Sequence, residues 1–187
     1  LTTDLSIPSR YLVYMPFGEH IGISQRIESE AERERLKVLT RLIRDEHSDS
    51  LKGGVIVRTA AEGISEEELR QDMSYLIKLW QHINEKKIKI QTPTLIYEEL
   101  PLYQRIIRDL VIQDVAKIYI DSRETLGKII DFVREFVPNA EDKLEHYPGE
   151  KPLFELYNVE DDLQKALSRK VLLKSGGYLI IDQTEAM

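Results

Sequence analysis

An apolar strand that runs directly into a capped helix is the feature that most constrains the fold. Residues 53–59 are mainly apolar and end on Arg58 and Thr59, and a turn of small residues leads to Ser65. Ser65 and Glu68 have the spacing of a capping box, in which a serine and a glutamate at a helix start satisfy each other's backbone N–H groups. Apolar residues then recur at helical spacing, which predicts an amphipathic helix: Leu69, Met73, Leu76, Ile77, Trp80 and Ile83.

Strands and helices alternate along the rest of the chain, which predicts a mixed α/β (α+β) fold. Ser122 has the position of a helix cap, and a Ser-Gly-Gly turn at 175–177 is expected to join the two strands of a hairpin. The expected strands and extended pieces are 11–16, 22–27, 94–97, 117–121, parts of 143–157, 171–173 and 178–181, and the other expected helices are 30–45, 102–111, 123–137 and 159–167.

Composition excludes several classes of protein. The 187 residues are 42% hydrophobic and 32% charged, as in a soluble globular protein, and no apolar run is long enough for a membrane span. The chain has no cysteine, so disulfides and thiolate metal sites are excluded and we expect a cytoplasmic location. The net charge of −7 is opposite to that of most nucleic-acid-binding surfaces. Any contact with RNA should therefore be local.

Arg58 and Thr59 are the best candidates for a binding site. A guanidinium pairs with two phosphate oxygens, and a neighbouring hydroxyl can donate to a third. Three glutamates, Glu66 to Glu68, occupy the first turn of the next helix, where they repel an anion. A phosphate would therefore bind at the strand end with Arg58 rather than at the helix start. The alternative is that Arg58 is an ordinary surface ion-pair partner.

The residue types and their spacing indicate no catalytic or metal site in this chain. Asp121, Asp182 and Glu185 follow expected strands, but their spacing gives no sign of the convergent carboxylates that two-metal chemistry requires, and we expect caps and turn residues. The histidines have neither metal-ligand nor triad spacing. Arg105 and Arg108 are expected on a solvated helix face, and Trp80 in the core.

Five segments together resemble the ribonuclease E/G family. They read RYLVYMP at 10–16, GISQRI at 22–27, VRTA at 57–60, GEKPLF at 149–154 and SGGYLIIDQTEA at 175–186. They follow the family's order and cover almost the whole chain. The resemblance implies a 5′-sensor domain at 1–103 and part of a ribonuclease-H-like subdomain at 104–187, with the joint near 98–101.

The resemblance also implies roles for individual residues. Arg58 and Thr59 match the pair that holds the 5′-monophosphate of single-stranded RNA, and Val13 matches an apolar residue beside the terminal nucleotide. Arg26 matches a second cation of this site. Two positions depart from the family pattern: Ser9 stands for a glycine, and Gln25 for an arginine. Loss of one cation from a phosphate site costs about 1–3 kcal/mol, so a structural scaffold or interaction module with a vestigial phosphate site remains the alternative.

The resemblance further implies a parent protein that is an Mg²⁺-dependent, homo-oligomeric endoribonuclease of RNA processing and decay. The family's metal-binding aspartates come after the final motif, so no catalytic or metal-binding residue is expected within residues 1–187. The chain begins at Leu1 and ends soon after an expected strand at 178–181, and we expect it to be a fragment that is inactive alone.

Overall fold

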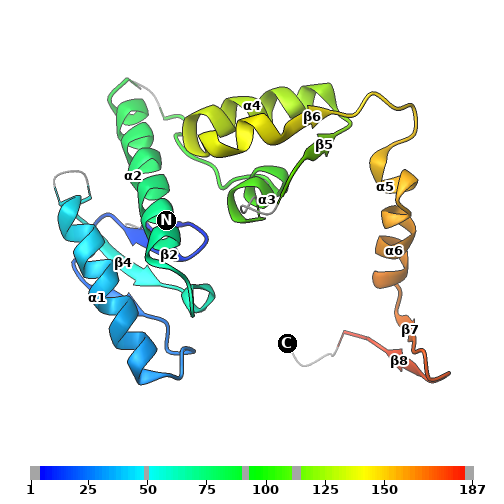
Figure 1. Ribbon diagram of the computed structural model, residues 1–187, viewed down its shortest axis with the longest axis horizontal. Helices are drawn as coiled ribbons and strands as arrows, with labels where there is room; N and C mark the ends of the chain where they lie inside the picture. The colour runs from blue at the N-terminus through cyan, green and yellow to red at the C-terminus, as the bar shows by residue number, and fades with distance from the viewer. Residues whose placement is uncertain (1–4, 49–50, 90–92, 111–114, 184–187) are drawn as a thin grey trace. The chain divides into compact units, whose positions relative to one another are not determined.

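The computed structural model describes residues 5–48, 51–89, 93–110 and 115–183 (Figure 1). The chain divides into two compact units, Leu1–Asp114 with Asp131–Glu141, and Val115–Ile130 with Asp142–Met187. These units follow spatial contacts and do not coincide with the expected ranges 1–103 and 104–187, so the domain boundary stays a prediction. No helix among the described residues is long and apolar enough to span a membrane.

A four-stranded sheet forms the centre of the first unit. Its strands are β1 (Ile7–Pro8), β2 (Leu12–Met15), β3 (Ile21–Ile23) and β4 (Gly54–Val57), in the spatial order β1-β2-β4-β3. β2 pairs antiparallel with β1 and β4, whereas β3 runs parallel to β4. The sequence predicted β2 and β4, and gave only an extended segment for β3. It missed β1, which is a two-residue pairing at the sheet edge.

Alternation along the strands gives the sheet one buried face and one open face. Leu12, Tyr14, Val55 and Val57 are at most 1% exposed, and α1 (Glu30–Glu46) and α2 (Glu66–Lys89) contact the strands that carry them. The intervening residues are half-buried and face the other side of the sheet. Each lies opposite the next on the neighbouring strand, so they form one row across the sheet, the open-face row: Pro8, Val13, Ile56 and Gly22. The two helices also contact each other, and Figure 1 shows them side by side.

Both long helices form where their local sequence predicts them. The Ser65 hydroxyl accepts from Glu68 N at 3.2 Å, while Glu68 Oε2 accepts from Ser65 N at 3.0 Å, which confirms the capping box. Ser29 caps α1 by accepting from Glu32 N at 3.3 Å. Trp80, expected in the core, is half-buried and packs edge-on against Tyr14 with their ring centroids 5.6 Å apart.

The helix α3 (Leu102–Leu110) corrects one expectation about charge. The side chain of Arg108 is only 10% exposed instead of solvated. Its guanidinium pairs with Asp109 at 2.6 Å, donates to Pro8 O at 3.3 Å and lies over the Tyr75 ring. A buried guanidinium needs such partners because it cannot be deprotonated. Arg105 is 48% exposed and lies 3.8 Å from Glu99.

The second unit contains short elements. β5 (Ile118–Ile120) pairs parallel with β6 (Leu144–His146), and β7 (Lys170–Leu172) pairs antiparallel with β8 (Tyr178–Ile180), which confirms the predicted hairpin. The helix α4 (Arg123–Phe136) begins in this unit and ends in the first, and η2 (Pro138–Lys143), α5 (Leu153–Leu156) and α6 (Val159–Ala166) follow.

The expected strand at 94–97 is wrong, the extended pieces expected within 143–157 are confirmed in part, and the fold class is confirmed as mixed α/β. Residues 94–97 form neither helix nor strand, because an apolar run becomes a strand only where another strand pairs with it. Within 143–157, only Leu144–His146 is a strand and Leu153–Leu156 is a helix, whose first N–H, that of Leu153, is accepted by Asp121 Oδ2 at 2.9 Å.

Candidate functional site

Arg58 directly follows β4 and is held by the turn at 9–12. Its backbone N–H donates to Tyr11 O at 2.8 Å, and its Nη1 donates to Ser9 O at 2.6 Å and to Arg10 O at 3.3 Å. The residue is nevertheless exposed. Its Nη2 and Nε make no hydrogen bond or ion pair with any described residue. The guanidinium is thus fixed on one edge, and its remaining N–H groups are available to an anion.

Thr59 provides a hydroxyl next to this arginine. It begins η1 (Thr59–Ala61), and its Oγ1 lies 2.9 Å from Ser24 Oγ, with either oxygen able to donate. Ser24 is aligned with the strand because its N–H donates to Val57 O at 2.8 Å. Ser24 lies within the GISQRI segment, whose sequence indicates no role for this serine. The structure therefore brings the Ser24 and Thr59 hydroxyls together at the end of β4, next in sequence to Arg58.

The turn at 24–27 carries the other two polar candidates, Gln25 and Arg26. Both are exposed, and Arg26 N donates to Ser24 Oγ at 3.4 Å. Their side chains make no hydrogen bond or ion pair within the described ranges. The turn itself is held from α1, since Arg33 Nη1 donates to Ser24 O at 2.9 Å and to Ile27 O at 3.4 Å.

Val13 and Ser9 differ in their exposure to solvent. Val13 is half-buried in the open-face row and pairs with Ile56. Ser9 is fully buried, and its hydroxyl donates to Asp72 Oδ2 at 2.5 Å and accepts from Leu12 N at 3.3 Å. Only the carbonyl of Ser9 contacts Arg58. The Ser9 hydroxyl, expected to stand in place of a glycine, therefore faces the interior.

Asp72 is a second residue, after Ser24, whose role was not predicted from the sequence. It lies three residues after Leu69, among the apolar residues of α2, and is 7% exposed. Burial raises the pKa of its carboxyl, while hydrogen bonds from Ser9 and from the N–H groups of residues 10–12 oppose that rise. The sequence did contain a signal for this role, since Asp72 lies among the apolar residues of the helix. A carboxylate on the buried face of an amphipathic helix needs hydrogen-bond partners from elsewhere in the fold.

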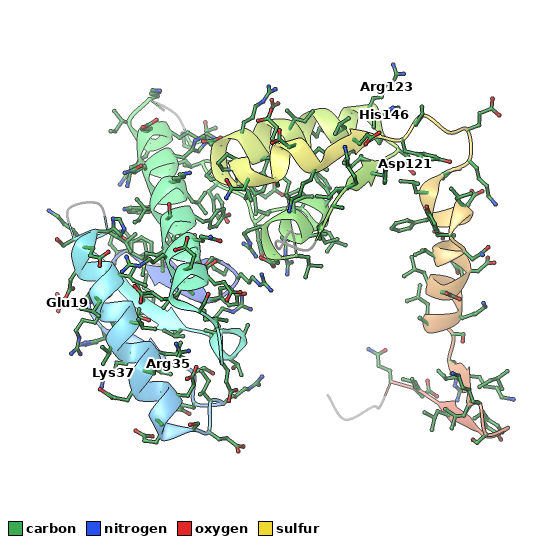
Figure 2. All side chains as sticks on the ribbon, viewed as in Figure 1. Glu19, Arg35, Lys37, Asp121, Arg123 and His146 are labelled. Carbon is green, nitrogen blue, oxygen red and sulfur yellow. The ribbon has the colours of Figure 1, made fainter. Side chains whose placement is uncertain are left out.

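Two side chains of α1 hold the turn that follows η1. Glu32 Oε1 accepts from Gly63 N at 2.9 Å, and Arg35 Nη2 donates to Ile64 O at 3.0 Å. Glu32 and Arg35 also pair with each other at 2.6 Å, which lowers the pKa of Glu32 to about 2. Gly63 has a φ of 76°, which favours glycine. Figure 2 labels Arg35 on α1.

The carboxylates considered for metal binding have ordinary partners. Asp121 accepts from Leu153 N as a cap, and Asp182 pairs with Arg169 at 2.6 Å. Glu185 lies outside the described residues. In the part of the chain that the structure describes, no group of three or more His, Cys, Asp or Glu side chains could hold a metal ion. Figure 2 shows Asp121 and His146 at the ends of β5 and β6.

Comparison with known proteins matches almost the whole chain. Residues 6–187 match the Ribonuclease E/G family. The chain is 52% identical over 187 residues to Ribonuclease G of Salmonella typhimurium (strain SL1344), covering 100% of this chain and 37% of that protein. It is 33% identical over 190 residues to Ribonuclease E of Nostoc sp. (strain PCC 7120), covering 100% of this chain and 27% of that protein.

One solved structure shows only a weak likeness. The RNase P protein of Staphylococcus aureus aligns with 42% of this chain and 82% of its own, at a TM-score of 0.37 and 17% identity. The chain thus spans little more than a third of the length of its ribonuclease G relative. The match over residues 6–187 shows that this chain belongs to the ribonuclease E/G family.

Proposed function

We propose that this chain recognises the 5′-monophosphate end of single-stranded RNA within an endoribonuclease of RNA processing and decay. The observation that carries the proposal is the arrangement at Arg58: Nη1 is bound to two carbonyls, while Nη2 and Nε have no partner among the described residues. A guanidinium fixed in this way binds a phosphate with less loss of side-chain entropy than a free one.

The neighbouring groups suit a terminal phosphate. A phosphate monoester has three non-bridging oxygens, of which the guanidinium can take two and the Thr59 hydroxyl, paired with Ser24, a third. The first phosphate of a 5′-triphosphate has only two such oxygens, and a 5′-hydroxyl has no anion. Val13 lies in an apolar row where a terminal base can pack. Exposed Arg26 adds positive charge, and Gln25 a neutral amide.

We assign cleavage to Mg²⁺-dependent chemistry in other parts of a cytoplasmic, homo-oligomeric parent enzyme, and no catalytic residue to residues 1–187. Family membership supports this assignment, and the chain spans 37% of its ribonuclease G relative. The metal would activate the attacking water and stabilise the developing charge on the phosphate. The residues described above bind and orient the substrate.

The test is a titration of one RNA oligonucleotide carrying either a 5′-monophosphate, a 5′-triphosphate or a 5′-hydroxyl, at one fixed salt concentration. The protein should bind the monophosphate form most tightly, and Arg58→Ala should remove that preference without changing the affinity for the hydroxyl form. If the protein does not distinguish the three ends, the sensor assignment is wrong and a scaffold with a vestigial site is the better description.

A further inference from the structure

Asp72 makes all its hydrogen bonds with one turn of the chain. Its Oδ2 accepts from Ser9 Oγ at 2.5 Å, Tyr11 N at 2.9 Å and Leu12 N at 2.9 Å, and its Oδ1 accepts from Arg10 N at 3.2 Å. No lysine or arginine pairs with this carboxylate within the described residues. A buried charge is costly unless hydrogen bonds replace its lost hydration. Here backbone N–H groups of the turn at 9–12 supply most of that replacement.

The same turn presents its carbonyl groups to Arg58. Ser9 O and Arg10 O accept from Nη1, and Tyr11 O accepts from the backbone N–H of Arg58. In a planar trans peptide, the C=O and the following N–H point in opposite directions. The peptide groups 9–10, 10–11 and 11–12 therefore each contact Arg58 through the carbonyl and Asp72 through the N–H.

The peptide groups 9–10 and 10–11 connect the buried carboxylate to the exposed guanidinium, and the peptide group 11–12 connects it to the Arg58 backbone. Each peptide dipole has its positive end toward Asp72 and its negative end toward Arg58, so both charges favour the same orientation of the turn. Hydrogen bonds in such chains strengthen one another. A rotation of this turn would remove acceptors from the arginine and donors from the carboxylate at once.

We propose that Asp72 is a positioning residue for 5′-phosphate recognition, acting on the Arg58 guanidinium through the peptide groups between Ser9 and Leu12. This inference rests on the proposed function of Arg58. Asp72 does not touch the RNA. It fixes the direction in which Nη2 and Nε of Arg58 face the phosphate.

Asp72→Asn is the most selective perturbation. The asparagine oxygen can keep the position of Oδ2, which has three donors, so its amide NH₂ takes the position of Oδ1 and faces Arg10 N. That contact is donor against donor. The peptide group 9–10 is then disturbed, and its carbonyl is the acceptor that lies 2.6 Å from Arg58 Nη1.

A double-mutant cycle over Asp72→Asn and Arg58→Ala tests the proposal, with the monophosphate and hydroxyl oligonucleotides as probes. Asp72→Asn should lower the preference for the monophosphate by about tenfold, the effect of one charge-assisted hydrogen bond. In the Arg58→Ala background it should change the preference no further. Glu68→Gln is the matched control, since this acid of the same helix touches Tyr11 only through the side-chain hydroxyl at 3.2 Å, and it should keep the preference.

The outcomes separate the two proposals. If the wild-type protein shows no preference, the proposed function fails. If Arg58→Ala loses the preference and folded Asp72→Asn keeps it, only the role of Asp72 is refuted.

A measurement on the wild-type protein covers the case in which Asp72→Asn does not fold. Binding of the monophosphate oligonucleotide should slow hydrogen exchange of the Arg10, Tyr11 and Leu12 amides, which donate to Asp72. The hydroxyl oligonucleotide should not have this effect. Unchanged exchange on binding of the monophosphate would refute the proposal.

Discussion

Replacement of Arg58 by lysine separates charge from geometry at the candidate site. Arginine has five N–H donors on three nitrogens, whereas lysine has three on one nitrogen. In the structure, Nη1 donates to Ser9 O at 2.6 Å and to Arg10 O at 3.3 Å, so only Nη2 and Nε remain for a phosphate. A single ammonium group cannot keep both carbonyls and also reach two phosphate oxygens.

The size of the effect follows from the hydrogen bonds that lysine loses. One charge-assisted hydrogen bond contributes about 1.5–3 kcal/mol. With a factor of ten for each 1.4 kcal/mol, Arg58→Lys should weaken binding of the 5′-monophosphate RNA by about ten- to a hundredfold. The affinity for the 5′-hydroxyl RNA should stay the same. Because the net charge is unchanged, the salt dependence of binding should also stay the same.

Fluorescence anisotropy with labelled oligonucleotides that differ only at the 5′ end measures both affinities. Arg134→Lys is the matched control, because Arg134 is 63% exposed and pairs with Glu141 rather than with any residue of the candidate site. It should leave both affinities unchanged. The contrary result is a ratio of the monophosphate and hydroxyl affinities in Arg58→Lys that stays within about twofold of the wild-type ratio. That result would show that charge alone explains recognition, and that the fixed geometry of the guanidinium is not required.

Three further predictions concern the supporting contacts. Ser24→Ala removes the partner of the Thr59 hydroxyl and should weaken monophosphate binding alone by about 0.5–1.5 kcal/mol in the same titration. The pKa of Glu32 is lowered from 4.5 to about 2 by hydrogen bonding to its arginine partner, so its stabilising effect is complete above pH 4.5 and disappears as the pH falls toward 2. Thermal unfolding should therefore show Glu32→Gln less stable than wild type at pH 7 and equally stable near pH 2, and a constant difference would contradict this. A Cβ on Gly53 would lie 2.3 Å from Met15 O, so Gly53→Ala should destabilise the protein by about 1–3 kcal/mol in urea unfolding, and an unchanged midpoint would refute the close contact.

The helices were predictable because their signals are local. The capping box at Ser65 and the apolar residues spaced 3.6 apart place the start of α2 within one residue. The expected helix 30–45 corresponds in the same way to Glu30–Glu46. Strands were predicted less well, because pairing partners lie far apart in sequence. Residues 94–97 have an apolar pattern but no partner strand among the described residues, whereas Ile7–Pro8 pairs with β2 although its sequence has almost no strand pattern.

The residues of the candidate site also differ in whether local sequence or tertiary contacts reveal them. The Arg58-Thr59 pair was recognisable from residue chemistry at the end of a strand and from the resemblance of the surrounding motifs. The role of Ser24 was not, because its hydroxyl meets Thr59 across 35 positions of sequence. Arg108 was expected in solvent, and its burial follows from Tyr75 and the Pro8 carbonyl, which no local pattern connects to it.

The sequence by itself determined the family, the mixed α/β class, the main helices and the arginine at the end of β4. Those features depend on residue type and on spacing within one or two turns of chain. Only the tertiary structure decided how the arginine is held. Asp72 and Tyr11 are 61 positions apart, and peptide dipoles align between Asp72 and Arg58 only when β2, β4 and α2 pack together. Hydrogen-bond geometry of that kind depends on distances and directions in space, which residue order does not specify.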